Sequence, residues 1–224
     1  MIPLRDDNPA QRTPVVTRLL ITANVLVFVY ELSLGDAMPE LLRNWGLVPG
    51  RLFAAVSGET SLPLEVATIF TSLFLHGGWL HLIGNMWYLW IFGDNVEDRM
   101  GSWRFLFFYF ASGFVAAVLH SAVMPGSPIP TVGASGAIAG VLGAYALAYP
   151  RARVLTLIPI FFIFRVVAVP ALVLLGVWFV YQFVAATLTM DSGSGGVAWW
   201  AHSAGFVFGF VVMALMTRRE RRAG

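Results

Sequence analysis

The 224-residue chain is 58% hydrophobic and only 12% charged, with a mean hydropathy of +0.76, and this composition excludes an ordinary soluble domain. It has no cysteine, which excludes disulfides, a thiol nucleophile and thiolate metal sites. All 14 basic residues are arginines, and most lie between apolar runs, so we interpret the pI near 9.3 as a signal of membrane orientation rather than of nucleic-acid binding.

The chain contains six apolar segments that are candidates for the roughly 20-residue helix needed to cross a bilayer. The first 17 residues lack the apolar core of a signal peptide, so we expect insertion by the first span. The sequence predicts an all-α membrane protein, a six-helix bundle at residues 18–217, between a cytoplasmic segment (1–17) and a basic cytoplasmic tail (218–224). The candidate spans are residues 18–34, 70–92, 103–124, 135–149, 166–190 and 199–217.

The arginine distribution supports this number of spans. With the N-terminus inside, twelve of the fourteen arginines fall in inner segments, and only Arg43 and Arg51 fall in outer ones. An excess of arginine in cytoplasmic segments is the usual signal of orientation. We therefore expect both termini in the cytoplasm.

Two connections are unusually apolar. Residues 35–67 are too apolar for a solvated loop, and we expect short amphipathic helices there, associated with the membrane interface. Residues 154–164 are too few for a span, and Pro159 and Arg165 argue against one, so we interpret them as a loop or interfacial segment.

Four polar side chains fall at one depth in this topology. Spans two, four and six all run from the outer to the inner face, which places His81, Asn85, Ser135 and His202 near the outer face. Polar groups in apolar spans usually face the bundle interior or a water-filled cavity. We therefore expect one shared cavity, with Ser135 as a candidate nucleophile and His202 as its candidate base.

The spacing agrees with this placement. His81 and Asn85 are four residues apart and share a helix face. In span six, a stripe of small residues follows His202 and favours close helix packing. The stripe is Gly205 and Gly209, and span four carries a similar groove formed by Gly136, Gly140 and Gly143.

Each feature also has a structural alternative. Ser135 alone is more typical of a helix N-cap, and His202 alone of an interhelical hydrogen bond. The His81 and Asn85 pair and the glycine stripes are, taken singly, more typical of helix packing. Because the four polar groups coincide, we favour the catalytic interpretation.

Other membrane chemistries do not fit the spacing. There is no His-Glu-x-x-His motif for zinc, and Asp94 has no second aspartate for an acid–base pair. Residues 133–137 are not Gly-x-Ser-x-Gly, because position 137 is alanine. We expect no metal and no cofactor.

The motifs resemble those of the rhomboid family of intramembrane serine proteases. Three segments carry the site motifs: Gly133-Ala134-Ser135-Gly136, residues 201–209 around His202, and His81-Leu82-Ile83-Gly84-Asn85. In addition, Glu97 with Gly101 resembles the family's acidic turn after the second helix. The resemblance covers roughly residues 15–215.

The resemblance implies a serine endopeptidase that cleaves single-span membrane proteins near the outer membrane face. Ser135 would be the nucleophile and His202 the general base, a dyad without a third acidic residue. His81, Asn85 and the Ser135 backbone N–H would form the oxyanion hole. Many members carry a tyrosine four residues after the serine, stacked on the histidine; here Ala139 stands there, so another aromatic or the helix contact would orient His202.

The resemblance also implies the partners and the location. The partners would be transmembrane segments of substrates and the bilayer, with spans two and five beside a lateral gate. Because nothing in the sequence resembles a transit peptide, we expect a bacterial cytoplasmic membrane rather than an organelle, with the active site on the extracytoplasmic side. One alternative is a catalytically silent rhomboid-like adaptor or chaperone, which would be expected to lack the serine or the histidine. A second alternative is a small transporter, which would carry polar groups along a path through the membrane rather than at one depth.

Overall fold

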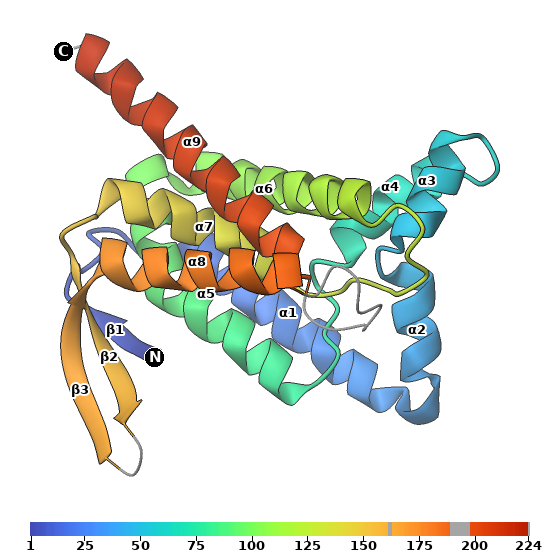
Figure 1. Ribbon diagram of the computed structural model, residues 1–224, viewed down its shortest axis with the longest axis horizontal. Coiled ribbons are helices and arrows are strands. Elements are labelled where there is room, and N and C mark those ends of the chain that lie inside the picture. Colours follow the sequence, from blue (N-terminus) through green and yellow to red (C-terminus); the bar gives the residue numbers. More distant parts are fainter. Residues whose placement is uncertain (161–162, 189–197, 224) are drawn as a thin grey trace.

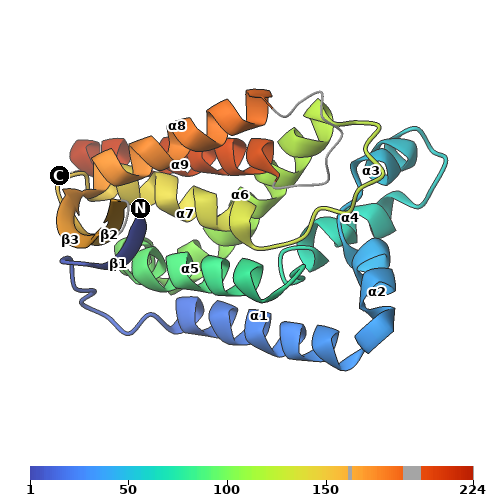
Figure 2. The same ribbon diagram turned by 60° about the horizontal axis from the view of Figure 1, so that its bottom comes forward.

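The structure, a computed structural model, describes residues 1–160, 163–188 and 198–223. It is a helical bundle with short helices at one end and a small sheet at the other (Figure 1 and Figure 2). The bundle helices are α1 (Val15–Ser33), α5 (Trp79–Met100), α6 (Ser102–Val123), α7 (Ser135–Ala148), α8 (Ala171–Leu188) and α9 (Trp199–Ala223).

Helix α7 is the centre of the bundle, because all of its residues from Gly136 to Ala146 are buried. Its small side chains allow close neighbours. A Cβ on Gly136 would stand 2.8 Å from the Ala116 Cβ of α6, and Cβ atoms on Gly140 and Gly143 would meet α6 and α9 as closely. Small residues at such contacts are typical of helices that associate in membranes.

Four of the described helices are long and apolar enough to cross a membrane by length and composition, namely α1, α6, α8 and α9. Helix α7 has 14 residues, and α5 has 22 but ends in a polar run. The prediction of a mostly helical membrane bundle is thus confirmed.

The predicted boundaries of spans one, three and four agree with the helices to within a few residues, and those of spans two, five and six differ more. Residues 70–92 are divided, because α4 (Leu62–Thr71) ends early and α5 begins at Trp79. The predicted span five extends to residues 189–190, which lie outside the described residues, and its first residues belong to a strand. Glu97 lies in the last turn of α5 rather than in a turn after it, and Gly101, with φ +81°, separates α5 from α6.

Glu97 fixes the start of α1 against the end of α5. Its buried carboxylate accepts hydrogen bonds from the backbone N–H groups of Val16 (3.0 Å) and Thr17 (2.8 Å). It also accepts from the hydroxyls of Thr17 (2.8 Å) and Ser102 (2.7 Å). These are the N–H groups that a helix start leaves without partners, so one carboxylate connects α1, α5 and α6.

The connection between α1 and α5 folds as short helices, as expected: η1 (Gly35–Ala37), α2 (Met38–Trp45), α3 (Pro49–Val56) and α4 (Leu62–Thr71). It also supports the segment that leads to Ser135. Leu47 and Thr131 exchange two backbone hydrogen bonds (3.1 and 2.7 Å), and Gly133 N–H donates to Ser72 C=O (2.8 Å). The connection is therefore part of the frame of the candidate site.

A three-stranded antiparallel sheet corrects the expectation of an all-α chain with a loop or interfacial segment at residues 154–164. The strands are β1 (Ile2–Asp6), β2 (Arg153–Ile160) and β3 (Ile163–Pro170), in the order β1-β2-β3. Val154 pairs with Asp6 on one side and Val169 on the other. Val154 and Thr156 are fully buried whereas Leu155 is not, an alternation typical of strands. The pairing of β1 with a strand so distant in the chain left no local signal in the sequence.

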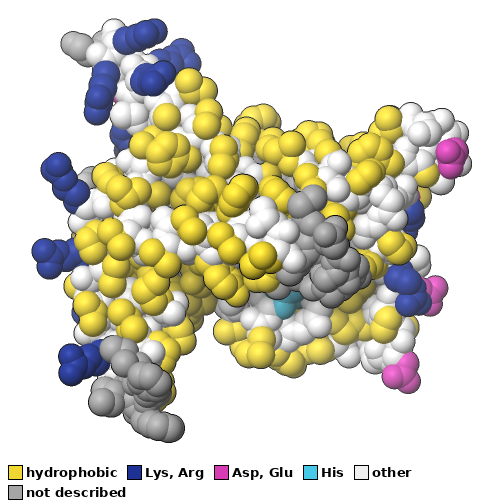
Figure 3. Space-filling view, in the orientation of Figure 1, with side chains coloured by type: hydrophobic (Ala, Val, Ile, Leu, Met, Phe, Trp, Pro, Cys, Tyr) yellow, Lys and Arg dark blue, Asp and Glu magenta, His cyan; other side chains and the backbone are white. Residues whose placement is uncertain are grey.

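Charged side chains gather at the two ends of the bundle and leave its sides apolar (Figure 3). Most arginines visible in that view lie at the end that holds the sheet and the C-terminus, while acidic side chains lie at the end formed by α2 and α3. Large apolar side chains such as Leu26, Phe107 and Val180 are more than half exposed on the sides. This is the surface expected of a protein surrounded by lipid.

Candidate active site

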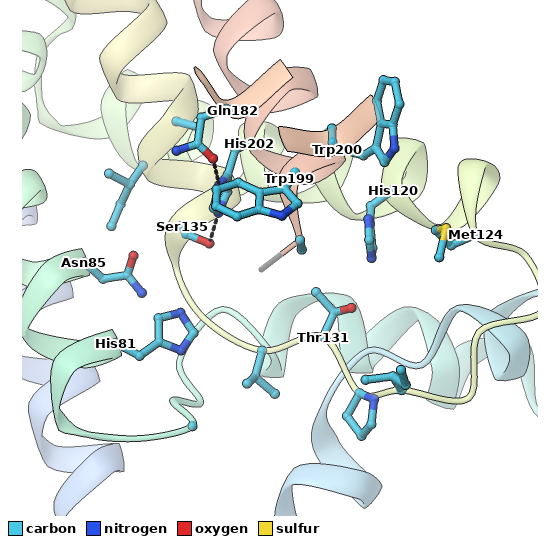
Figure 4. Close-up of a pocket in the computed structure, with 18 of the residues that line it drawn as sticks. His81, Asn85, His120, Met124, Thr131, Ser135, Gln182, Trp199, Trp200 and His202 are labelled. Carbon is cyan, nitrogen blue, oxygen red and sulfur yellow. Dashed lines mark hydrogen bonds between the residues drawn. The ribbon is translucent and has the colours of Figure 1, made fainter. Parts of the chain in front are cut away.

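Ser135 is the first residue of α7, and its hydroxyl does not cap the helix. The N-cap position is Ala134, and α7 has no side-chain cap hydrogen bond. Instead, Ser135 Oγ lies 2.7 Å from His202 Nε2 (Figure 4). The N-cap alternative is therefore wrong for Ser135.

His202 stands in the first turn of α9, which lies in direct backbone contact with α7. A Cβ on Gly205 would overlap the Gly136 carbonyl oxygen, and a Cβ on Gly209 would overlap that of Gly140. The glycine stripes therefore bring together the two predicted helices. Because His202 is one turn before Gly205, the imidazole reaches the serine that precedes Gly136.

The protonation of the His202 ring follows from its two partners. Nδ1 lies 2.7 Å from Gln182 Oε1, and a carbonyl oxygen can only accept a hydrogen bond. Nδ1 therefore carries the proton, and Nε2 presents its lone pair to the Ser135 hydroxyl. This is the tautomer that a general base requires.

Gln182 was not among the sequence candidates. It comes from α8 and is buried, as is His202. A single amide in an otherwise apolar span was the available signal, since polar residues inside membrane helices usually have a function.

His81 and Asn85 lie on the other side of Ser135 from His202 (Figure 4). Both pack against the turn at Gly133, where φ is +112°. A Cβ on Gly133 would stand 2.5 Å from His81 Nε2 and 3.3 Å from Asn85 Nδ2, so only glycine fits there without strain. The structure thus brings all four predicted polar residues to one place.

His76 is a second residue that sequence reasoning missed, because it is five residues from His81 and off its helix face. Its Nδ1 lies 3.3 Å from Phe74 C=O, which makes Nδ1 the donor and Nε2 an acceptor. Asn85 Nδ2 donates to that Nε2 at 3.0 Å. The Glu31 carboxylate accepts from His76 N–H (3.1 and 3.2 Å), so α1 fixes the residue that orients Asn85.

Two aromatic rings lie near His202, which is one of the two alternatives that the absence of a tyrosine at Ala139 left open. The Trp178 ring lies at 6.0 Å with an interplanar angle of 32°, and Trp199 lies at 6.2 Å in an edge-on arrangement. Trp178 is one turn before Gln182 on the same helix. Helix α8 therefore contributes both an aromatic ring and a hydrogen-bond acceptor to the histidine.

The four predicted residues line a cavity of about 970 Å³, together with Gln182 and Trp178. Its walls come from α5, the end of α6, the 124–134 connection, α7, α8 and α9. A volume of this order is ample for a short peptide segment. In the described parts of the chain, no cluster of three or more His, Asp or Glu side chains has the arrangement of a metal site.

Comparison with known proteins identifies relatives of this chain. The chain is 36% identical over 132 residues to the rhomboid protease GluP of Bacillus subtilis, covering 58% of this chain and 24% of that protein. It is 30% identical over 159 residues to the mitochondrial RHOMBOID-like protein 6 of Arabidopsis thaliana (60% and 51% covered). It is 31% identical over 132 residues to the putative rhomboid protease YdcA of Bacillus subtilis (59% and 61% covered).

These alignments leave a large part of each relative unmatched, since the chain spans from about a quarter to about three fifths of their lengths. The family model of the Rhomboid domain, however, matches residues 63–219, which include α5 to α8, most of α9 and the four polar residues predicted for the site. This match extends over more than half of the chain, and the protein therefore belongs to the rhomboid family.

Proposed function

We propose that this protein is an intramembrane serine endopeptidase that cleaves single-span transmembrane substrates near the outer membrane face. The observation that carries the proposal is the 2.7 Å hydrogen bond between Ser135 Oγ and His202 Nε2 inside an apolar helical bundle. The dyad faces a cavity of about 970 Å³, and the chain shares its family with proteins named as proteases.

In the first half of the proposed reaction, Ser135 Oγ attacks the carbonyl carbon of the scissile peptide bond. The hydroxyl proton moves to His202 Nε2, and the carbonyl oxygen becomes an oxyanion. His81, Asn85 and the Ser135 backbone N–H would donate hydrogen bonds to it, and such preorganised donors stabilise the charge that develops. The N-terminus of α7 adds a favourable dipole at the same place.

The tetrahedral intermediate then collapses. The C–N bond breaks as His202 Nε2 returns the proton to the leaving amine, which leaves an acyl ester on Ser135. Water from the cavity attacks this ester, gives its proton to Nε2, and releases the carboxylate product as Oγ recovers the proton. His202 thus acts as a base and as an acid in each half of the cycle.

We propose that six helices, α1 and α5 to α9, cross the bilayer with both termini in the cytoplasm. The proposal is supported by the gathering of arginines at the end with the sheet and the C-terminus. The membrane domain would occupy residues 18–217, with residues 1–17 and 218–224 in the cytoplasm of a bacterial cell. Ser135 and His202 would then lie towards the extracytoplasmic face.

The catalytic proposal is tested with purified protein in liposomes that carry a single-span substrate labelled at both ends. We expect two fragments from the wild type, and none from the Ser135→Ala or His202→Ala variant. Equal cleavage by the wild type and Ser135→Ala would overturn the proposal. Binding of the substrate without cleavage, together with no reaction towards a fluorophosphonate, would favour the adaptor.

A further inference from the structure

Gln182 is the one polar residue on the inner side of α8. The buried residues of this helix form a stripe towards α7 and α9, made up of Ala171, Leu174, Leu175, Gln182 and Ala186. The helix is otherwise among the most apolar of the described spans. An amide at this position is costly in a bilayer unless it has a partner, and its partner is the histidine of the dyad.

The hydrogen bond between Gln182 Oε1 and His202 Nδ1 is protected from water. The distance is 2.7 Å, and the two residues are 6% and 7% exposed. In the parts of the chain that the structure describes, Nδ1 makes no hydrogen bond to a carboxylate. The neutral Gln182 amide therefore occupies the position that the acidic residue has in a serine–histidine–aspartate triad. Figure 4 shows Gln182, His202 and Ser135 in a continuous chain of hydrogen bonds.

We propose that Gln182 is a positioning residue for the His202 base. This inference rests on the proposed function and deepens it. Its carbonyl holds the proton on Nδ1 and so keeps the Nε2 lone pair aimed at Ser135. When Nε2 takes the Ser135 proton, Nδ1–H still donates to Gln182, whose carbonyl dipole stabilises the positive ring without adding a charge to the apolar site.

Helix α8 sets the orientation of the base in this account. Gln182 holds the edge of the His202 ring, and the Trp178 ring, one turn earlier, lies tilted beside it with the ring centroids 6.0 Å apart. A displacement of α8 away from α9 would remove both contacts together. The activity of the dyad is therefore coupled to the position of this helix.

The test uses the rate of fluorophosphonate labelling, because this small probe requires an active serine but no transmembrane substrate. We expect Gln182→Met that retains a cooperative thermal transition to label roughly 10- to 100-fold more slowly than the wild type. Leu174→Met, a change to methionine at a buried position of the same stripe, is the matched control and should label at the wild-type rate. Equal rates for Gln182→Met and the wild type would overturn the proposal.

Gln182→Glu separates positioning from packing, because it keeps the size and the acceptor and adds a negative charge. A carboxylate beside Nδ1 favours the protonated imidazole, so the acidic limb of the labelling rate should move to higher pH by about one unit or more. Among the residues that the structure describes, the other ionisable groups whose charges reach His202 are His81 of α5 and His120 of α6, and both are unchanged in this variant. An acidic limb identical to that of the wild type would contradict the proposal.

Nitrogen NMR of histidine-labelled protein gives a readout that does not depend on activity. We expect the His202 ring of the wild type to carry its proton on Nδ1, and this preference to be lost in Gln182→Met. If the wild-type protein does not react with the fluorophosphonate, the proposed function is contradicted. The NMR result then still shows whether Gln182 accepts the hydrogen bond from His202 Nδ1. An unchanged Nδ1–H signal in Gln182→Met would refute the positioning role whatever the labelling result.

Discussion

Gly205 of α9 lies so close to Gly136 of α7 that a Cβ on Gly205 would overlap the Gly136 carbonyl oxygen. This backbone contact sets the geometry of the site. Ser135 immediately precedes Gly136, and His202 is one turn before Gly205, so the two side chains meet where the two helices touch. A wider helix separation would break the 2.7 Å hydrogen bond between them.

Gly205→Ala should therefore impair both stability and catalysis. The added methyl group must displace the α7 backbone, and overpacking of this kind costs about 1–3 kcal/mol. We expect a lower thermal midpoint in detergent and at least a roughly tenfold lower cleavage rate. Gly176→Ala is the matched control, since a Cβ there has nothing within 4 Å, and it should leave both quantities near their wild-type values. Wild-type stability and activity in Gly205→Ala would show that the helix contact is not as close as described.

Removal of the Asn85 amide should reduce the catalytic constant with little effect on KM. A single donor to a developing oxyanion is typically worth about 100- to 1,000-fold in rate, and it acts on the transition state rather than on the bound substrate. We expect a loss of this order in Asn85→Ala, measured by steady-state cleavage of a reconstituted substrate. Gly84→Ala, next to Asn85 and with free space around the new methyl group, is the control. A rise in KM with an unchanged catalytic constant would place Asn85 in substrate binding instead.

His76→Phe should lower the catalytic constant in the same way as Asn85→Ala, but to a smaller extent. Phenylalanine keeps an aromatic ring but cannot accept the hydrogen bond that orients the Asn85 amide. We expect an intermediate loss of catalytic rate, smaller than that of Asn85→Ala. The double variant should lose little more than Asn85→Ala alone, because both changes act on one amide. If the losses of activation free energy in the two single variants add up fully in the double variant, His76 acts independently of Asn85.

The sequence was most informative where local pattern decides the structure. The small residues at Gly136, Gly140, Gly205 and Gly209 predicted the close helix pair, and polar residues in apolar spans predicted the site. These features are visible because each is unusual in a membrane segment.

Features that depend on distant partners could not be read in the same way. The sheet joins residues that are far apart in the chain, and Pro3 and Thr156 pair across it without any local pattern. His76 lies before the start of α5 and is placed by Glu31 of another helix. Gln182 was a visible polar residue, but only tertiary packing shows that it faces His202.

Glu97→Gln should destabilise the fold without changing the geometry of the dyad directly. The carboxylate accepts four hydrogen bonds, and an amide replaces one acceptor oxygen with a donor that faces other donors. Leaving buried donors unpaired costs about 1–3 kcal/mol, so we expect a lower midpoint in thermal or denaturant unfolding. Glu59→Gln, the same change at an exposed site, should have no measurable effect. Equal midpoints for the two variants would exclude a structural role of the carboxylate.

The docking of β1 should depend on pH through Asp6. Burial raises the pKa of Asp6 from 3.8 to about 6, the Tyr145 hydroxyl opposes this shift by donating a hydrogen bond, and the charge of Asp94 adds to it. Because the folded pKa exceeds the unfolded one, the native state binds more protons between these values, and docking strengthens as the pH falls from about 6 to about 4.

Hydrogen exchange of the backbone amides of Ile2, Leu4, Arg5 and Asp6 measures this dependence. After correction for the intrinsic exchange rate, protection should increase as the pH falls through that window and should level off below it. In Asp6→Asn, which cannot ionise, protection should be independent of pH over the same range. A wild-type profile as flat as that of the variant would show that Asp6 does not control the docking of the strand.

The most direct test of the proposed dyad is to identify the residue that reacts with a fluorophosphonate. Purified protein in liposomes is treated with the probe, digested, and analysed by mass spectrometry. We expect a single adduct on Ser135 in the wild type, lost in His202→Ala, because the hydroxyl is a weak nucleophile without the base at 2.7 Å. Labelling of a different serine, or equal labelling of Ser135 in His202→Ala, would contradict the Ser135–His202 mechanism.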